Sequence, residues 1–146
     1  MKSSTSLLLA RLAIGLVVLW NVQCAIVFLL WPERFTAGFE LTGTPAEAAL
    51  RGVGVLFLMW NVPYAVALWH PVRYRISLYE ATAMQAIGVF GETLILLGLP
   101  PGHSVLQASL QRFIAFDGAG LILLLLAIWL ARRAAVPGEA KFYPEI

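Results

Sequence analysis

The sequence predicts an all-α integral membrane protein with four transmembrane helices in an antiparallel bundle. Hydrophobic residues make up 60% of the 146-residue chain and charged residues only 12%, whereas soluble domains are about 25% charged. Four apolar runs are long enough to cross a bilayer core about 30 Å thick, which takes roughly 20 helical residues. A membrane barrel would need many short alternating strands instead. We therefore expect helices, in a single domain over residues 1–146.

The first apolar run is about 25 residues long, whereas the core of a signal peptide has only 7–15. We therefore expect it to remain in the protein as a transmembrane span. The fourth run ends at the pair Arg132-Arg133. The four spans are expected at about residues 7–31, 46–69, 76–99 and 105–131.

Prolines mark the ends of three of these spans. Pro32, Pro71 and Pro100 each follow an apolar run, where a proline stops a helix. Pro63 lies inside the second run and is expected to kink or loosen that helix, which membrane proteins tolerate when neighbours satisfy the freed carbonyl.

Basic residues are distributed unequally between the two predicted sides of the membrane. Seven of the ten Lys and Arg residues fall in the N-terminus, the loop between the second and third runs, and the C-terminal segment. The positive-inside rule therefore predicts that both termini are cytoplasmic. As the location we expect the plasma membrane of a prokaryote.

One sequence pattern occurs twice. Residues 11–22 read RLAIGLVVLWNV and residues 51–62 read RGVGVLFLMWNV, and in each case a second apolar run, a tryptophan and a proline follow. Each copy holds one span, so a true repeat would be inverted across the membrane, as in some transporters. Membrane helix ends generally favour Trp, Arg and Pro, so a chance recurrence is the alternative, and both interpretations stay open.

Polar side chains occur near the middle of every predicted span. Lipid offers them no hydrogen-bond partners, so they are expected to point into the bundle and form a polar pocket. Helical spacing places Gln85, Gly88 and Glu92 on one face of the third span. It likewise places Asp117 and Gly120 on one face of the fourth. The predicted pocket residues are Asn21, Gln23, Asn61, Gln85, Glu92 and Asp117.

Hairpin geometry predicts a partner for the buried glutamate. A turn near Gly102 would place Glu92 level with Arg112 across the third and fourth spans. An unpaired charge in mid-membrane costs at least ~2.5–3.5 kcal/mol. We therefore expect an ion pair between Glu92 and Arg112, with Arg51 as the second candidate.

The same geometry predicts that Asn61 faces Gln85, because a turn near Arg73 places them at equal depth. Two interpretations of the pocket follow. In the structural one, Glu92 is neutralised by its arginine and the amides bond across helices. In the functional one, the pocket opens outward and Asp117 takes up and releases a proton.

Known catalytic and cofactor motifs are missing from the sequence. It has no phosphate-binding loop, nucleophile elbow or zinc-ligand spacing, and His70 and His103 fall at opposite membrane faces, where they cannot hold one haem. We therefore expect no cofactor, no metal and no catalytic residue. No nucleic-acid partner is expected either, because the basic residues lie at the ends of spans.

Two short stretches resemble a known family. RLAIGLVVLW at the start of the first run, the proline after that run, and the small-residue-rich RGVGVLFLMW are similar to the DoxX-type group of small four-helix membrane proteins. The resemblance covers the hydropathy plan of the whole chain but only these stretches by residue. It implies a four-helix membrane fold. Some members are linked to redox or quinone-associated complexes. The resemblance itself implies little about activity.

The expected role is that of a non-catalytic accessory or assembly subunit of a membrane complex. The expected partners are the lipid bilayer and either other membrane protein subunits or further copies of this chain. One alternative is a small transport or ligand-binding protein that uses the polar pocket. Another is a quinone-associated enzyme subunit that uses Glu92 and Asp117. A cavity around these two carboxyl groups would favour transport or binding, and a fully paired core would favour the accessory role.

Overall fold

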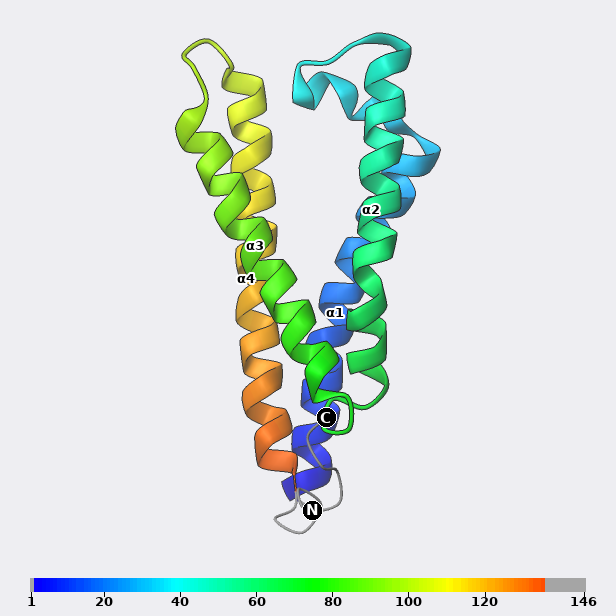
Figure 1. Ribbon diagram of the computed structural model, residues 1–146, viewed down its shortest axis with the longest axis vertical. Helices are drawn as coiled ribbons and strands as arrows, with labels where there is room; N and C mark the ends of the chain where they lie inside the picture. The colour runs from blue at the N-terminus through cyan, green and yellow to red at the C-terminus, as the bar shows by residue number, and fades with distance from the viewer. Residues whose placement is uncertain (1, 136–146) are drawn as a thin grey trace.

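The computed structural model describes residues 2–135, and the regular structure in this range is helical. The four long helices in this range are each long and apolar enough to cross a membrane, which confirms the predicted all-α class. They are α1 (Lys2–Leu30), α2 (Gly43–Trp69), α3 (Arg75–Gly98) and α4 (Ser104–Ala134), as Figure 1 shows.

The helices extend past the apolar runs at several ends. α1 starts at Lys2 and α4 continues through Arg132 and Arg133 to Ala134, because polar residues at a helix end keep their backbone hydrogen bonds while leaving the apolar region. α2 remains one continuous helix through Pro63.

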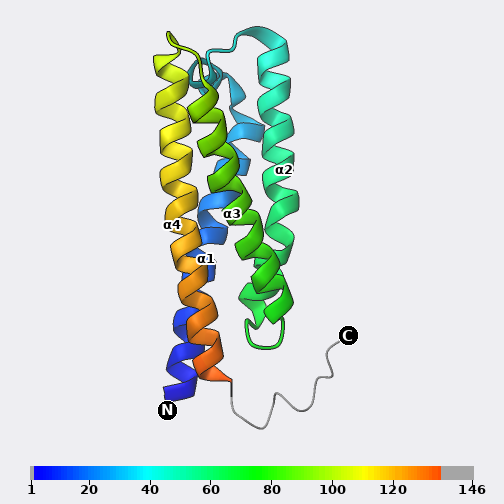
Figure 2. The ribbon, with the colours of Figure 1, turned by 60° about the vertical axis from the view of Figure 1, so that its left-hand side comes forward.

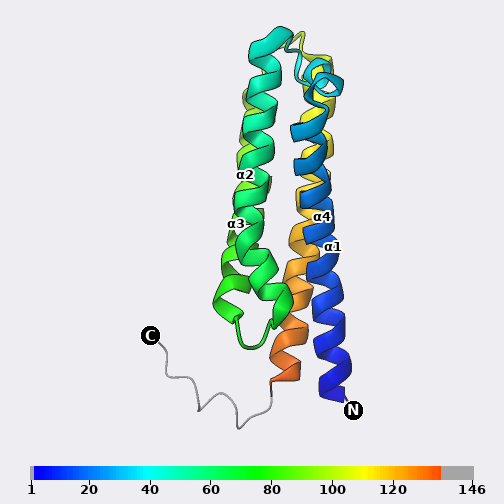
Figure 3. The same ribbon diagram turned by 90° about the vertical axis from the view of Figure 1, so that its right-hand side faces the viewer.

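The four helices form a ring in which each one packs on its two chain neighbours, with α4 closing the ring on α1. Within residues 2–135, no Cα atoms of the diagonal pairs, α1 with α3 and α2 with α4, lie within 8 Å of each other. Figure 1 shows the α1–α2 pair beside the α3–α4 pair, and Figure 3 shows α2 with α3 and α1 with α4. The α2–α3 contact is the least extensive of the four, and the two pairs in Figure 1 diverge toward one end.

The two ends of the molecule differ in structure. At one end, which we call the basic end, α1 begins, residues 70–74 connect α2 to α3, and α4 stops (Figure 2). At the other, which we call the strap end, residues 99–103 connect α3 to α4. Residues 31–42 also lie there, and we call them the strap. The strap contains two short 3-10 helices, η1 (Pro32–Arg34) and η2 (Thr36–Phe39).

The strap is fastened to the start of α4. The backbone N–H of Leu106 donates to Glu40 Oε1 (3.1 Å), and His103 Nδ1 lies 2.5 Å from Glu40 Oε2. Ser109 Oγ donates to the Gly38 carbonyl (2.6 Å). No side chain of its own capping residue caps α4, so Glu40 supplies this cap from the strap. The hydrogen bond with His103, and then that from Leu106, hold the pKa of Glu40 below its usual value.

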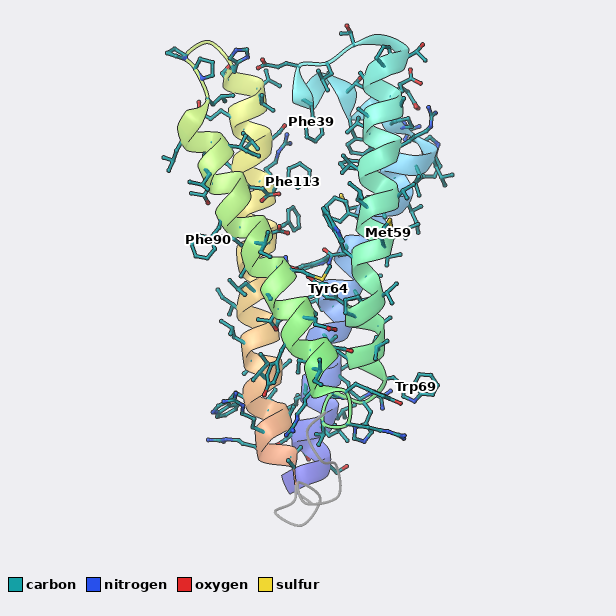
Figure 4. All side chains as sticks on the ribbon, viewed as in Figure 1. Phe39, Met59, Tyr64, Trp69, Phe90 and Phe113 are labelled. Carbon is teal, nitrogen blue, oxygen red and sulfur yellow. The ribbon has the colours of Figure 1, made fainter. Side chains whose placement is uncertain are left out.

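The interior has an apolar half and an aromatic half. Toward the basic end, small and branched side chains from all four helices form the buried core, including Ile14, Val17, Ala67, Leu78, Ala81, Leu124 and Ala127. Toward the strap end, Phe28 is 2% exposed and contacts four other phenylalanine rings at centroid distances of 5.2–6.4 Å. Figure 4 shows two rings of this cluster, Phe39 and Phe113, between the strap and α4.

Candidate functional site

Three helices meet through one glutamine in the middle of the bundle. The Tyr64 hydroxyl on α2 donates to Gln85 Oε1 on α3 (2.8 Å), and Gln85 Nε2 donates to Asp117 Oδ1 on α4 (2.9 Å). Tyr64 is 3% exposed and Gln85 5%; Figure 4 shows Tyr64 directed into the interior. The amide oxygen of Gln85 accepts from the tyrosine, so the amide nitrogen is turned toward the aspartate. Tyr64 thereby orients the group that holds Asp117.

Two glycines make room for this contact. A Cβ atom on Gly88 would overlap Asp117 Oδ2, and a Cβ atom on Gly120 would lie 2.9 Å from Gln85 Nε2 and 3.1 Å from Gln85 Cδ. The predicted face of Gln85 and Gly88 on α3 therefore does meet the predicted face of Asp117 and Gly120 on α4. Small residues allow this close approach, as they commonly do between membrane helices.

In the part of the chain that the structure describes, two buried acceptor atoms have no donor. Glu92 Oε2 and Asn61 Oδ1 are both buried and have no hydrogen-bond partner among residues 2–135. The Asn61 amide nitrogen donates to the Phe57 carbonyl of its own helix (2.7 Å). Glu92 follows Gly88 by one helical turn, so it lies on the side of α3 that faces Asp117. We refer to Asn61, Tyr64, Gln85, Glu92 and Asp117 as the polar cluster.

The predicted ion pair of Glu92 is not formed within the described part of the chain. Arg112 is exposed and donates through Nη2 to Ser109 Oγ (2.9 Å). Arg51 is also exposed and pairs with Glu47 at 3.5 Å. The position of a hairpin turn fixes the depth of a residue along the helix but not its direction around the helix axis. Arg112 lies five residues from Asp117, which rotates it about 140° away from the interior face of α4.

The predicted contact between Asn61 and Gln85 is not formed either. The α2 residue that meets Gln85 is Tyr64, three residues further along the helix. A pairing of residues 64 and 85 centres the turn nearer to Tyr74 than to Arg73. This small change at the turn shifts the expected partner by nearly one helical turn.

The α1 residues of the predicted pocket stand apart from the cluster. Gln23 is exposed on the outer surface of α1, so its assignment to the pocket was wrong. Asn21 is half-buried, and no hydrogen bond of its side chain is formed within residues 2–135. Cys24, one residue after Gln23 on α1, is half-buried.

Sequence reasoning missed Tyr64, although one signal could have identified it. Tyr64 follows Asn61 by three residues and so shares its helix face. A buried tyrosine hydroxyl usually has a hydrogen-bond partner, and a mid-span tyrosine is therefore a candidate partner for a mid-span amide.

An exterior groove of about 520 Å³ lies between α2 and α3. It contains none of the polar-cluster residues, and it lies between α2 and α3, the neighbouring helices with the least extensive contact. Within residues 2–135, no group of three or more His, Cys, Asp or Glu residues is placed to hold a metal ion. The groove is lined by Val62, Pro63, Val66, Ser77, Glu80, Ala83 and Met84.

No family model, no curated protein and no solved structure matches this chain. The chemistry of the polar cluster is that of an acceptor-rich site. It holds two carboxyl groups, and within the described residues no salt bridge joins a Lys, Arg or His side chain to Glu92 or Asp117. Such a site can take up a group that carries positive charge or donates a hydrogen bond.

Proposed function

We propose that this chain is a four-span membrane protein with an antiparallel bundle and both termini in the cytoplasm. Four long apolar helices support membrane insertion. The short connections at alternating ends support the antiparallel arrangement, as Figure 2 illustrates. Exposed arginines at the basic end, such as Arg73 and Arg132, support its cytoplasmic orientation. Reporter fusions after residue 146 and within residues 36–44 should report opposite sides, and a cytoplasmic strap would contradict this topology.

We propose further that the protein is of the transport or ligand-binding class and takes up a proton or a small monovalent cation at the polar cluster. The observation that carries this proposal is the pair of buried, unpartnered acceptors, Glu92 Oε2 and Asn61 Oδ1. A buried acceptor without a donor costs about 1–3 kcal/mol, and a charged one costs more. A proton or a cation bound there removes this cost.

The incomplete pairing distinguishes this function from the accessory role. A polar core that only holds helices together would be expected to satisfy all of its members. Here Gln85 is bonded to both Tyr64 and Asp117, while Glu92 and Asn61 each have an acceptor atom without a donor among residues 2–135. The accessory role, the quinone-associated role and the DoxX-type resemblance stay predictions.

Two hydrogen bonds between α1 and α2 support the inverted repeat as part of this proposal. Arg11 Nε donates to the Leu68 carbonyl (3.1 Å), and Arg51 Nε donates to the Leu29 carbonyl (3.4 Å). The two arginines hold equivalent positions in the repeated pattern. Each binds a carbonyl in the last turn of the other helix, as a two-fold relation between the copies would require.

The binding proposal is tested by thermal unfolding of the detergent-solubilised protein over a range of pH and in sodium or potassium salts. The variant is Glu92→Gln, and the matched control is Glu80→Gln, which changes an exposed glutamate on the same helix. We expect protons or one of the cations to raise Tm of the wild type and of the control more than Tm of Glu92→Gln. An equal response of all three proteins would overturn the proposal.

A further inference from the structure

The basic end of the molecule carries a concentration of exposed guanidinium groups. The acid nearest to it in α3 is Glu80, five residues after the helix begins. The strap end is different, because its arginines are accompanied by Glu33, Glu40 and Glu47. Of these, Glu47 forms an ion pair with Arg51. The exposed arginines of the basic end are Arg11, Arg73, Arg75, Arg132 and Arg133.

Two of these guanidinium groups are held by aromatic rings on the outer surface. The guanidinium carbon of Arg133 lies 3.6 Å from the centroid of the Trp129 ring. Arg132 lies over the Tyr79 ring at 6.0 Å and donates to its hydroxyl (3.4 Å). No carboxylate among residues 2–135 forms a salt bridge with either arginine. Stacking uses the face of the Arg133 guanidinium and leaves its N–H edge available to a ligand, and Arg132 has further N–H donors besides the one bonded to Tyr79.

We propose that the basic end binds the phosphate headgroups of anionic phospholipids, with Arg132 and Arg133 as the principal contacts. Arg73 stands at the same end, 5.4 Å from the Tyr74 ring. A guanidinium fork binds phosphate through two parallel hydrogen bonds, and tryptophan and tyrosine place such groups at headgroup depth. The cytoplasmic leaflet is the anionic one, which matches the proposed orientation.

This inference rests on the membrane insertion of the proposed function and is independent of the polar cluster. Glu92→Gln is therefore expected to leave lipid binding unchanged, so that failure of one proposal does not decide the other. Each arginine near an anionic membrane surface contributes a factor of about five in affinity. Removing two of them should weaken binding on the order of tenfold or more.

The test uses the full chain in an uncharged detergent, with phosphatidylglycerol or phosphatidylcholine added, and counts bound lipids by native mass spectrometry. The variant is Arg132→Gln with Arg133→Gln. The matched control is Arg34→Gln with Arg112→Gln, which removes the same charge at the strap end, where Arg34 also lies over a tryptophan ring, Trp31, at 5.7 Å. We expect phosphatidylglycerol to bind the wild type and the control in preference to phosphatidylcholine, and to bind the variant at least tenfold more weakly.

Three results would overturn the proposal. The first is equal loss in the variant and the control, and the second is equal binding of both lipids. The third is full competition by glycerol phosphate at the same concentration, which would indicate a general anion site.

A second variant, Arg132→Lys with Arg133→Lys, keeps the charge but removes the planar fork. It should bind phosphatidylglycerol with intermediate affinity, and binding as weak as to phosphatidylcholine or as strong as in the wild type would contradict the proposed contacts.

Discussion

The interface between α1 and α2 and the interface between α3 and α4 both use glycines, but they solve the problem of polar groups differently. Between α1 and α2, Arg11 and Arg51 donate side-chain hydrogen bonds to backbone carbonyls near the two ends of the interface. Between α3 and α4, Gln85 binds Asp117 at the centre, and Arg132 donates to the Tyr79 hydroxyl at the basic end. Both interfaces therefore have a side-chain hydrogen bond near an end, and the second also has one between two side chains in the interior.

The difference in the position of their polar contacts suggests different roles for the two helix pairs. An arginine at a helix end can keep its charge near water, so a contact of this kind stabilises helices without burying a charge. A carboxyl group in the interior has no such escape, and this is why we propose a binding role for it. The α1–α2 pair therefore acts as the support, and α3 and α4, with Tyr64 of α2, hold the polar cluster.

The largest effect is expected from Gly54→Ala in the support. A Cβ atom at Gly54 would lie 3.0 Å from the Ala25 carbonyl oxygen and 3.0 Å from Leu29 Cγ. A backbone carbonyl cannot move aside as a side chain can, so α1 and α2 must separate. We expect the free energy of unfolding to fall by about 1–3 kcal/mol, as for overpacked cores. The measurement is thermal unfolding in detergent. Gly52→Ala is the control, because nothing lies within 4 Å of its Cβ position, and equal losses in both variants would contradict the account.

A smaller effect is expected from Gly88→Ala in the cluster. The new methyl group displaces Asp117 Oδ2, and the aspartate can rotate only by giving up its bond from Gln85. Hydrogen bonds between membrane helices average about 0.6 kcal/mol with a maximum near 1.7, and we expect a loss in this range. Unlike Gly54→Ala, this variant should also lose the response to protons or cations. The control is Gly91→Ala, whose Cβ position is open and which should keep both stability and response.

Tyr64→Phe isolates the orienting hydrogen bond of the cluster. Removing the hydroxyl leaves Gln85 Oε1 without its donor, and we expect a loss of about 0.6 kcal/mol. A double-mutant cycle with Gln85→Met measures the coupling. If the cycle shows no coupling, Tyr64 does not position Gln85, and the cluster consists of α3 and α4 alone.

The smallest effect concerns the strap and depends on pH. The hydrogen bond with His103 lowers the pKa of Glu40 in the folded protein, so Glu40 stabilises the fold above the usual glutamate pKa of about 4.3. That contribution is lost as the pH falls below this value and through the lowered pKa. Glu40→Gln should therefore have a lower Tm than the wild type at neutral pH, and the difference should close in acid. Glu33→Gln in the same strap should show no such closing gap, and a gap that widens in acid would contradict the assignment.

The helices and the interior faces of α3 and α4 were accessible from the sequence, whereas the partners of individual side chains were not. Apolar length indicated four helices, and spacing of three and four residues put Gln85 with Gly88 and Asp117 with Gly120. Arg112 was predicted as the partner of Glu92 because the two lie at equal depth. Which side chains meet also depends on their angular position around the helix axis, and equal depth does not fix that position. The contact of Glu40 in the strap with the start of α4 links residues more than 60 positions apart, and no local sequence pattern predicts it.

We propose that Glu92 is a titrating group of a binding site and not a fixed structural member. The most direct test is infrared difference spectroscopy of the purified protein during acid and base jumps, in which a protonated carboxyl group has a C=O band that shifts in heavy water. We predict a carboxyl band that changes with pH in the wild type and in Glu80→Gln, and that is absent from Glu92→Gln. A Glu92→Gln spectrum identical to that of the wild type would show that Glu92 does not exchange a proton, and would contradict the account.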